Sequence, residues 1–120
     1  MKLFDSELKI LDTLWTHGDS TAKRIAEILN DQIGWSKTTT YTVIKKCVDK
    51  GVVARKEPHF VCSALITRQE AQEMETTELI NRMYGGMSDQ LVASILWREN
   101  LSKEEIDRLK TLITDLESKA

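Results

Sequence analysis

The 120-residue sequence predicts a mainly α-helical protein with one small β-hairpin. Apolar residues recur at intervals of three and four along most of the chain, as in helices that bury one face. Two β-prone runs, residues 51–55 and 60–66, flank a short segment that contains the single proline, Pro58. Because proline removes a hydrogen-bond donor from a sheet, Pro58 is expected in the turn of a hairpin.

Three helices are expected before the hairpin. Residues 4–16 repeat apolar side chains at helical spacing, from Phe4 to Trp15, and form the first helix. A second helix is predicted over residues 21–31, and a loop over residues 31–35 is expected to end it. The third helix begins after Ser36, a favourable N-cap, and runs to about Lys50, where Gly51 is expected to stop it.

The third predicted helix has two chemically different faces. At about 100° per residue, one face carries Thr40, Ile44, Cys47 and Val48 and is expected to pack against the domain. The opposite face shows hydroxyl and ammonium groups to solvent. Its residues are Thr38, Thr39, Thr42, Lys45, Lys46 and Asp49, with Tyr41 at its border.

The remainder of the chain is predicted to be helical. Residues 68–84 and 88–99 form two helices separated by Gly85-Gly86, and the capping-box pattern that starts at Ser102 opens a last helix. The apolar faces of this tail are too broad for one pair of helices to bury, so we expect a homodimer interface. We therefore predict a winged domain over residues 1–68 and a helical dimerisation domain over 69–120. The expected interface residues are Leu91, Val92, Ile95, Leu96, Ile106, Leu109, Leu112, Ile113 and Leu116.

Charge is distributed unevenly, although the net charge is only -2. Residues 1–70 carry a small excess of basic side chains and residues 71–120 an excess of acidic ones. Between residues 36 and 56 the only acid is Asp49, among six lysines and arginines. This asymmetry indicates that the N-terminal part faces a polyanion.

The order helix, helix, helix, hairpin is that of a winged helix-turn-helix, whose third helix enters the major groove of DNA. Threonine hydroxyls and methyls suit contacts with base edges, and lysines further along suit phosphates. The wing would contact the neighbouring backbone or the minor groove. The expected DNA-binding residues are Ser36, Lys37, Thr38, Thr39, Tyr41, Thr42, Lys45, Lys46, Arg55, Lys56 and His59.

Catalytic, cofactor and membrane patterns are missing from the sequence. It has no phosphate-binding glycine loop, nucleophile elbow or His-Glu-x-x-His helix, so we expect no enzyme activity and no cofactor. Cys47 and Cys62 are too few for a disulfide framework and lack metal-ligand spacing. No apolar run is long enough to span a membrane or resembles a signal sequence, so we expect a cytoplasmic protein.

A resemblance to a known family begins at the third predicted helix. The run Trp35-Ser36-Lys37-Thr38-Thr39-Thr40-Tyr41-Thr42-Val43-Ile44, closed by Lys50-Gly51, resembles the recognition segment of the penicillinase repressor family (BlaI/MecI/CopY). In that family a Trp-Ser pair leads into a threonine-rich helix that ends Lys-Gly before the wing. The stretches 11–15, 81–86 and 100–106 are also similar, so the likeness covers nearly the whole chain.

The resemblance implies a homodimer with swapped tails that places two winged domains on an inverted repeat in operator DNA. In the β-lactam-responsive members a protease cuts within the helix that corresponds to 88–99. The resemblance therefore implies an inactivating protease as a further partner. By position the bond here would be Ser94–Ile95, which departs from the Asn-Phe bond of those members. Copper-responsive members carry a C-terminal Cys-x-Cys motif that this tail lacks. We therefore expect a DNA-binding, dimeric repressor and assign no inducer.

Two alternatives remain open at this point. In the first, Cys47, Cys62 and His59 bind a metal or report oxidation, since Cys62 is expected on the hairpin behind the packed side of the third helix. In the second, the protein is a winged module that binds another protein and no DNA, which its acidic net charge favours slightly.

Overall fold

The computed structural model describes residues 2–98 and 100–120 and divides into two compact units. The first unit ends at Thr77 and the second begins at Glu78, inside helix α4. The boundary that we expected at residue 68, between a winged domain and a dimerisation domain, stays a prediction. No helix within the described residues is long and apolar enough to cross a membrane.

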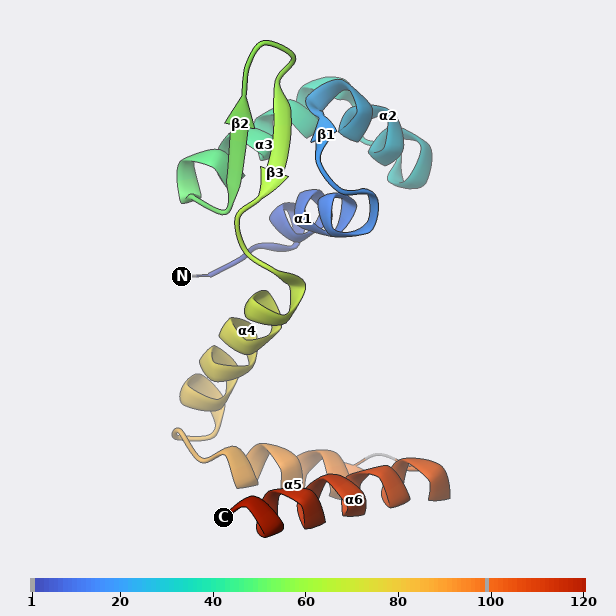
Figure 1. Cartoon of the computed structure of the whole chain (residues 1–120), viewed down its shortest axis with the longest axis vertical. Helices are drawn as coiled ribbons and strands as arrows, with labels where there is room; N and C mark the ends of the chain where they lie inside the picture. The colour runs from blue at the N-terminus through green and yellow to red at the C-terminus, as the bar shows by residue number, and fades with distance from the viewer. Residues whose placement is uncertain (1, 99) are drawn as a thin grey trace. The chain divides into compact units, whose positions relative to one another are not determined.

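The first unit confirms the mainly helical fold with a small sheet (Figure 1). Its elements are α1 (Asp5–His17), β1 (Ser20–Thr21), α2 (Ala22–Ile33), α3 (Lys37–Lys50), β2 (Val53–Lys56), β3 (Val61–Ala64) and the first part of α4 (Arg68–Met83).

Local signals start and stop these helices. The Thr21 hydroxyl caps α2 by accepting from the backbone N–H of Arg24 at 3.1 Å. Our prediction that α2 ends at residue 31 was wrong by two residues, because the helix continues to Ile33 and Gly34 forms its C-cap. Gly34 adopts φ 72°, a left-handed conformation that glycine takes without a steric penalty, and its N–H bonds to the carbonyl of Asn30.

The sheet has three antiparallel strands in the order β1-β3-β2. Strands β2 and β3 form the predicted hairpin, with Val53 opposite Ala64 and Lys56 opposite Val61, but both are shorter than the predicted runs. Strand β1 was not predicted. It has only two residues and pairs Ser20 with Cys62, so it is too short to show an alternating pattern.

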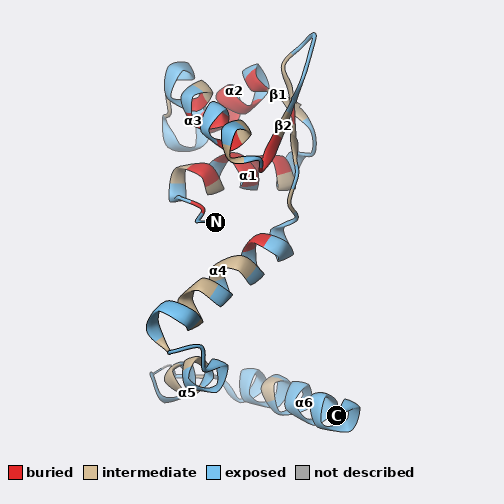
Figure 2. Cartoon of the chain, turned by 90° about the vertical axis from the view of Figure 1, so that its left-hand side faces the viewer, coloured by how far each residue is buried: buried red, intermediate tan, exposed pale blue. Residues whose placement is uncertain are grey.

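The core of the first unit lies between α1, α2, α3 and the hairpin. Ile10, Ile25 and Ile44 are fully buried, and the hairpin contributes Val53 and Cys62. Figure 2 shows these buried residues in red, gathered in α1, α2, α3 and the strands. This packing fixes the side of α3 that faces inward.

Three members of the apolar stripe predicted for α1 are not fully buried, namely Phe4, Leu8 and Trp15. Phe4 is exposed because it is the residue that precedes the helix, and Leu3 before it is buried instead. Trp15 is half-buried, and its indole Nε1–H donates to the carbonyl of Ile66 at 2.9 Å.

The second unit holds the end of α4, α5 (Ser88–Arg98) and α6 (Lys103–Lys119). Residue 99, the last position of the helix predicted over 88–99, lies outside the described residues. The predicted capping box is present: Ser102 Oγ accepts from Glu105 N at 3.1 Å, and Ser102 N donates to Glu105 Oε1 at 3.2 Å. No residue of α5 or α6 is buried (Figure 2).

Candidate nucleic-acid interface

Helix α3 separates its apolar and polar residues as the sequence predicts, with one difference. Its inward face buries Thr40, Val43, Ile44 and Cys47, whereas Val48, which we expected on that face, is only half-buried. Of the eleven predicted DNA-binding residues, Tyr41 is half-buried and the other ten are exposed. The helix therefore has an apolar side fixed in the core and a polar side open to solvent.

The hydroxyl groups at the start of α3 are largely used within the helix. Ser36 Oγ accepts from the N–H of Thr39 at 3.1 Å and lies 3.0 Å from Thr39 Oγ1. Thr42 Oγ1 donates to the carbonyl of Thr38 at 2.9 Å. Ser36 thus fixes the helix start, while Thr42 keeps an outward methyl and the acceptor lone pairs of its oxygen.

Five of the predicted residues surround one shallow hollow on the outer side of α3. The hollow is lined by Lys37, Thr38, Tyr41, Thr42 and Lys45. Ammonium groups at both ends and threonines between them suit a duplex edge, where phosphates flank the base edges of the groove.

The three lysines further along α3 have different surroundings. Lys45 Nζ lies 3.4 Å from Asp49 Oδ2, and both side chains are mostly exposed, so this ion pair is weak and open to exchange with phosphate. Lys46 makes no ion pair with any described residue. Lys50, which we did not include in the predicted interface, turns inward onto the buried Glu7.

The wing presents its cations beside an aromatic ring, that of Phe60, which the sequence did not single out. Arg55 Nε donates to Glu57 Oε1 at 2.7 Å, and its guanidinium carbon lies 3.7 Å from the ring centroid of Phe60. Lys56 and His59 are exposed in the same wing. In the sequence, Phe60 was only the first residue of an apolar strand, and no local pattern distinguished it.

The two cysteines are buried thiols. Burial raises the pKa of Cys47 to about 12 and, despite the nearby charge of Arg55, that of Cys62 to about 11. Their Sγ atoms contact the backbone carbonyls of Glu7 and Phe60 at 3.9 and 3.8 Å. Thiols with such pKa values carry little of the thiolate that reacts with oxidants or metals.

A metal site at Cys47, Cys62 and His59 is not formed. Across residues 2–98 and 100–120, no group of three or more His, Cys, Asp or Glu side chains is placed to hold a metal ion. His59 lies exposed in the wing, whereas both thiols are buried in the core. The metal-binding form of the sensor alternative therefore has no site among the described residues.

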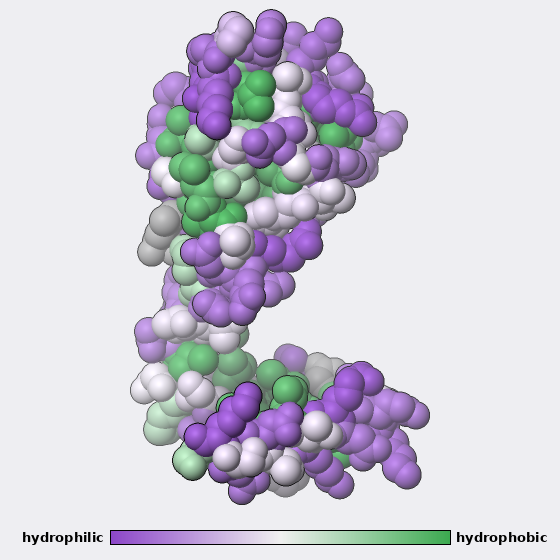
Figure 3. All heavy atoms as spheres, viewed as in Figure 1, coloured by the Kyte–Doolittle hydropathy of each residue, from purple (hydrophilic) through white to green (hydrophobic). Residues whose placement is uncertain are grey.

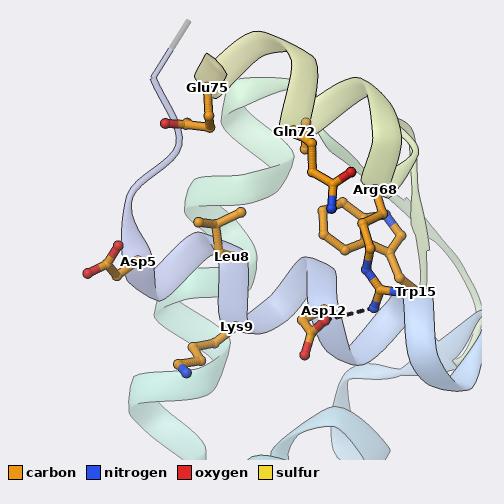
Figure 4. Close-up of a pocket in the computed structure, with 9 residues that line it drawn as sticks. Asp5, Leu8, Lys9, Asp12, Trp15, Arg68, Gln72 and Glu75 are labelled. Atoms are coloured by element: carbon orange, nitrogen blue, oxygen red, sulfur yellow. Dashed lines mark hydrogen bonds and ion pairs between the residues drawn. The ribbon is translucent and has the colours of Figure 1, made fainter. Parts of the chain in front are cut away.

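A second hollow lies between α1 and the first turns of α4 (Figure 4). Arg68 Nη2 pairs with Asp12 Oδ1 at 2.9 Å, and the guanidinium of Arg68 lies 5.4 Å from the Trp15 ring. At its other end Glu75 Oε1 accepts from the N–H of Leu3 at 3.3 Å. These contacts attach the start of α4 to α1, and none of the residues predicted to bind DNA lines this hollow.

These features define a class of protein. A helix with a buried apolar side and an exposed Thr/Lys side, followed by a basic hairpin, is the winged helix-turn-helix of transcription regulators. A model of the family described as "Penicillinase repressor" matches residues 3–115. The chain belongs to the penicillinase repressor family, whose members are transcriptional repressors and not enzymes.

Known relatives match over nearly the full length. The methicillin resistance regulatory protein MecI of Staphylococcus aureus (strain N315) is 25% identical over 114 residues, which cover 93% of this chain and 93% of MecI. The penicillinase repressor of Bacillus licheniformis is 26% identical over 116 residues, 95% of this chain and 91% of the relative. Among solved structures, a MarR family regulator from Neisseria meningitidis matches with a TM-score of 0.43 and 17% identity, over 98% of this chain and 80% of the regulator. The family model and the two repressors, MecI and the penicillinase repressor, confirm the resemblance noted in the sequence.

Proposed function

We propose that this protein represses transcription in the cytoplasm by binding a pseudo-palindromic operator as a homodimer, with α3 of each protomer in the major groove. The observation that carries this proposal is the division of α3 into a core-facing side, with Ile44 and Cys47, and a solvent-facing side of threonines and lysines. A bound repressor blocks the promoter by occupying it.

Side chains on the exposed side of α3 have separate roles. Thr38 and Thr42 contact base edges, because their short side chains bring a methyl or an oxygen close to the groove floor. Lys45 and Lys46 lie further along the helix and neutralise phosphates, which contributes affinity without sequence preference. From the wing, Arg55 and Lys56 bind the neighbouring backbone.

The unburied apolar residues of the second unit support the proposed dimer. Trp97 is 89% exposed and Leu112 59%, and no residue of α5 or α6 is buried. Figure 3 shows hydrophobic side chains of this unit in green at the surface, among hydrophilic ones. Soluble monomers rarely expose apolar residues this densely, so a second copy is the partner that would cover them. Of the predicted interface set, only Leu91 and Leu109 are half-buried; the other members are exposed.

Proteolytic inactivation at Ser94–Ile95 would require a local opening of α5. The bond lies inside the helix, and Ser94 Oγ is 3.0 Å from the hydroxyl of Tyr84 and donates to the carbonyl of Leu91. A protease binds an extended segment, so α5 must unwind before it can be cut there. The cut would remove α6, with most of the apolar residues assigned to the dimer.

Selection from a random duplex library tests this function. We expect the purified protein to enrich an inverted repeat with half-sites one helical turn apart, and to bind it at least about a thousandfold more tightly than random DNA, which is the lower end of the usual range for such proteins. Failure to enrich any motif, with a folded and dimeric protein, would reject DNA recognition and favour the protein-binding alternative.

A further inference from the structure

Four side chains form a continuous line of contacts from the start of α3 to the wing. Lys37 Nζ lies 5.5 Å from the ring centroid of Tyr41. The Tyr41 ring meets that of Phe60 edge-on, with centroids 5.7 Å apart and planes at 75°. Arg55 in turn lies over the ring of Phe60, with its guanidinium carbon 3.7 Å from the ring centroid. Each contact falls within the range of cation–π and aromatic pairs.

Phe60 is held by its backbone as well as by its ring. Its carbonyl accepts the N–H of Ala22 at 3.0 Å and is contacted by Cys62 Sγ at 3.8 Å. Its φ of 50° is uncommon for a bulky residue, so the surrounding contacts must maintain it. The ring is therefore a fixed surface between the recognition helix and the wing.

Arg55 is oriented from two sides. Its flat face lies against Phe60, and its Nε donates to Glu57 Oε1 at 2.7 Å. Stacking uses the face of a guanidinium and leaves the N–H groups at its edge free to donate in their own plane. An arginine that is ordered before binding loses less conformational entropy when it meets a phosphate.

We propose that Phe60 and Tyr41 are positioning residues that fix Arg55 of the wing and Lys37 of the recognition helix relative to one another, so that both cations meet the phosphate backbone together when α3 enters the groove. This inference rests on the proposed DNA-binding function. Phe60 acts on DNA binding through Arg55. Tyr41 connects α3 to the wing through its contact with Phe60, and it makes no direct contact with a base.

A double-mutant cycle on operator binding tests the inference. Phe60→Leu, Arg55→Gln and the double variant are compared with the wild type at one salt concentration, on the selected operator. We expect each single change to weaken binding about fivefold, since one ordered long side chain is lost, and the double variant to bind like Arg55→Gln. Phe60→Tyr keeps the ring and should restore binding. Unchanged affinity in Phe60→Leu, or two losses that simply multiply, would overturn the proposal.

A DNA-free measurement separates positioning from a loss of folding. Relaxation of the ¹⁵N nucleus of Arg55 Nε should show a restricted side chain in the wild type and in Phe60→Tyr, and a mobile one in Phe60→Leu, while the backbone spectrum of α1 and α2 stays the same. A mobile Arg55 in the wild type would refute the positioning role even if DNA binds.

Failure of the inference and failure of the proposed function give different results. If the wild type enriches no DNA motif, the proposed function itself fails. If the wild type binds DNA but the double-mutant cycle is additive, only the positioning role fails.

Discussion

Lys50 Nζ donates to Glu7 Oε1 at 2.5 Å and thereby ties the last turn of α3 to the first turn of α1. The Glu7 side chain is 3% exposed and that of Lys50 22%. The same carboxylate accepts the N–H of Phe4 at 2.8 Å, and Lys50 also donates to the carbonyl of Lys2 at 2.7 Å. Helix α3 is thus fixed at its C-terminal end by a nearly buried charge pair.

Removing the cation of this pair should destabilise the domain. Lys50→Met leaves the Glu7 carboxylate buried without its partner, and we expect a loss of about 3 kcal/mol in the free energy of unfolding at pH 7. Lys45→Met is the matched control, because its partner Asp49 is exposed and such pairs contribute about 0.5 kcal/mol. Urea unfolding measures both. Similar small losses in the two variants would show that the buried pair is not coupled to folding.

The pair should also give stability a defined pH dependence. Burial alone raises the pKa of Glu7, but the hydrogen bonds from Lys50 and Phe4 and the charges of Lys50 and Lys46 outweigh burial and lower the pKa below 4.5. A carboxyl group with a lowered folded-state pKa stabilises the fold above its unfolded-state pKa and loses that contribution as pH falls through the folded value. The stability advantage of the wild type over Glu7→Gln should therefore shrink below about pH 4.5. An advantage that stays constant from pH 7 to pH 3 contradicts this assignment.

The faces of α3 were predictable because they depend on local periodicity. Thr40 and Ile44 lie inside and Thr42 outside, as the helical repeat alone requires, and Ser36 and Gly51 are local start and stop signals that the structure confirms. The shorter hairpin and the longer α2 differ from prediction at element ends, where local signals compete.

Features that depend on distant residues were not predictable. Glu7 and Lys50 are separated by 43 positions, and nothing in either local sequence indicates that they meet. The ring of Phe60 becomes part of the candidate interface only because the wing folds back beside Tyr41. Strand β1 exists because β3 offers a free edge to the two residues before α2.

Lys45 and Lys46 should contribute affinity without specificity. Each change to alanine removes one phosphate contact, so binding to operator and random DNA should weaken alike, and the slope of log affinity against log salt should become shallower by about 0.9. Electrophoretic mobility shifts over a salt series measure this slope. Lys9→Ala is the control, since Lys9 lines the hollow between α1 and α4 and should leave the slope unaltered.

Thr42 should contribute specificity more than affinity. Its hydroxyl proton is used by the Thr38 carbonyl, so the methyl group and the oxygen lone pairs are what it presents to a base. Thr42→Ala should lower the ratio of operator to random-DNA affinity about tenfold, whereas Thr42→Val, which keeps a methyl, should lower it less. Competition binding on both DNAs gives the ratio. Equal losses on operator and random DNA would mean that Thr42 does not contact a base.

A charge on the apolar side of α6 should separate the protomers. Leu112 is 59% exposed in one protomer, so Leu112→Asp should leave the protomer folded, yet in a dimer it would bury an unpaired carboxylate. We expect sedimentation to show a monomer at micromolar concentration and operator affinity to fall at least tenfold, because the second half-site no longer binds intramolecularly. Thr111→Asp places the same charge on the opposite side of α6, where Thr111 Oγ1 donates to the carbonyl of Asp107, and should remain dimeric. If both variants stay dimeric, the protomers associate through another surface, and if both dissociate, the effect comes from charge on α6 rather than from its apolar side.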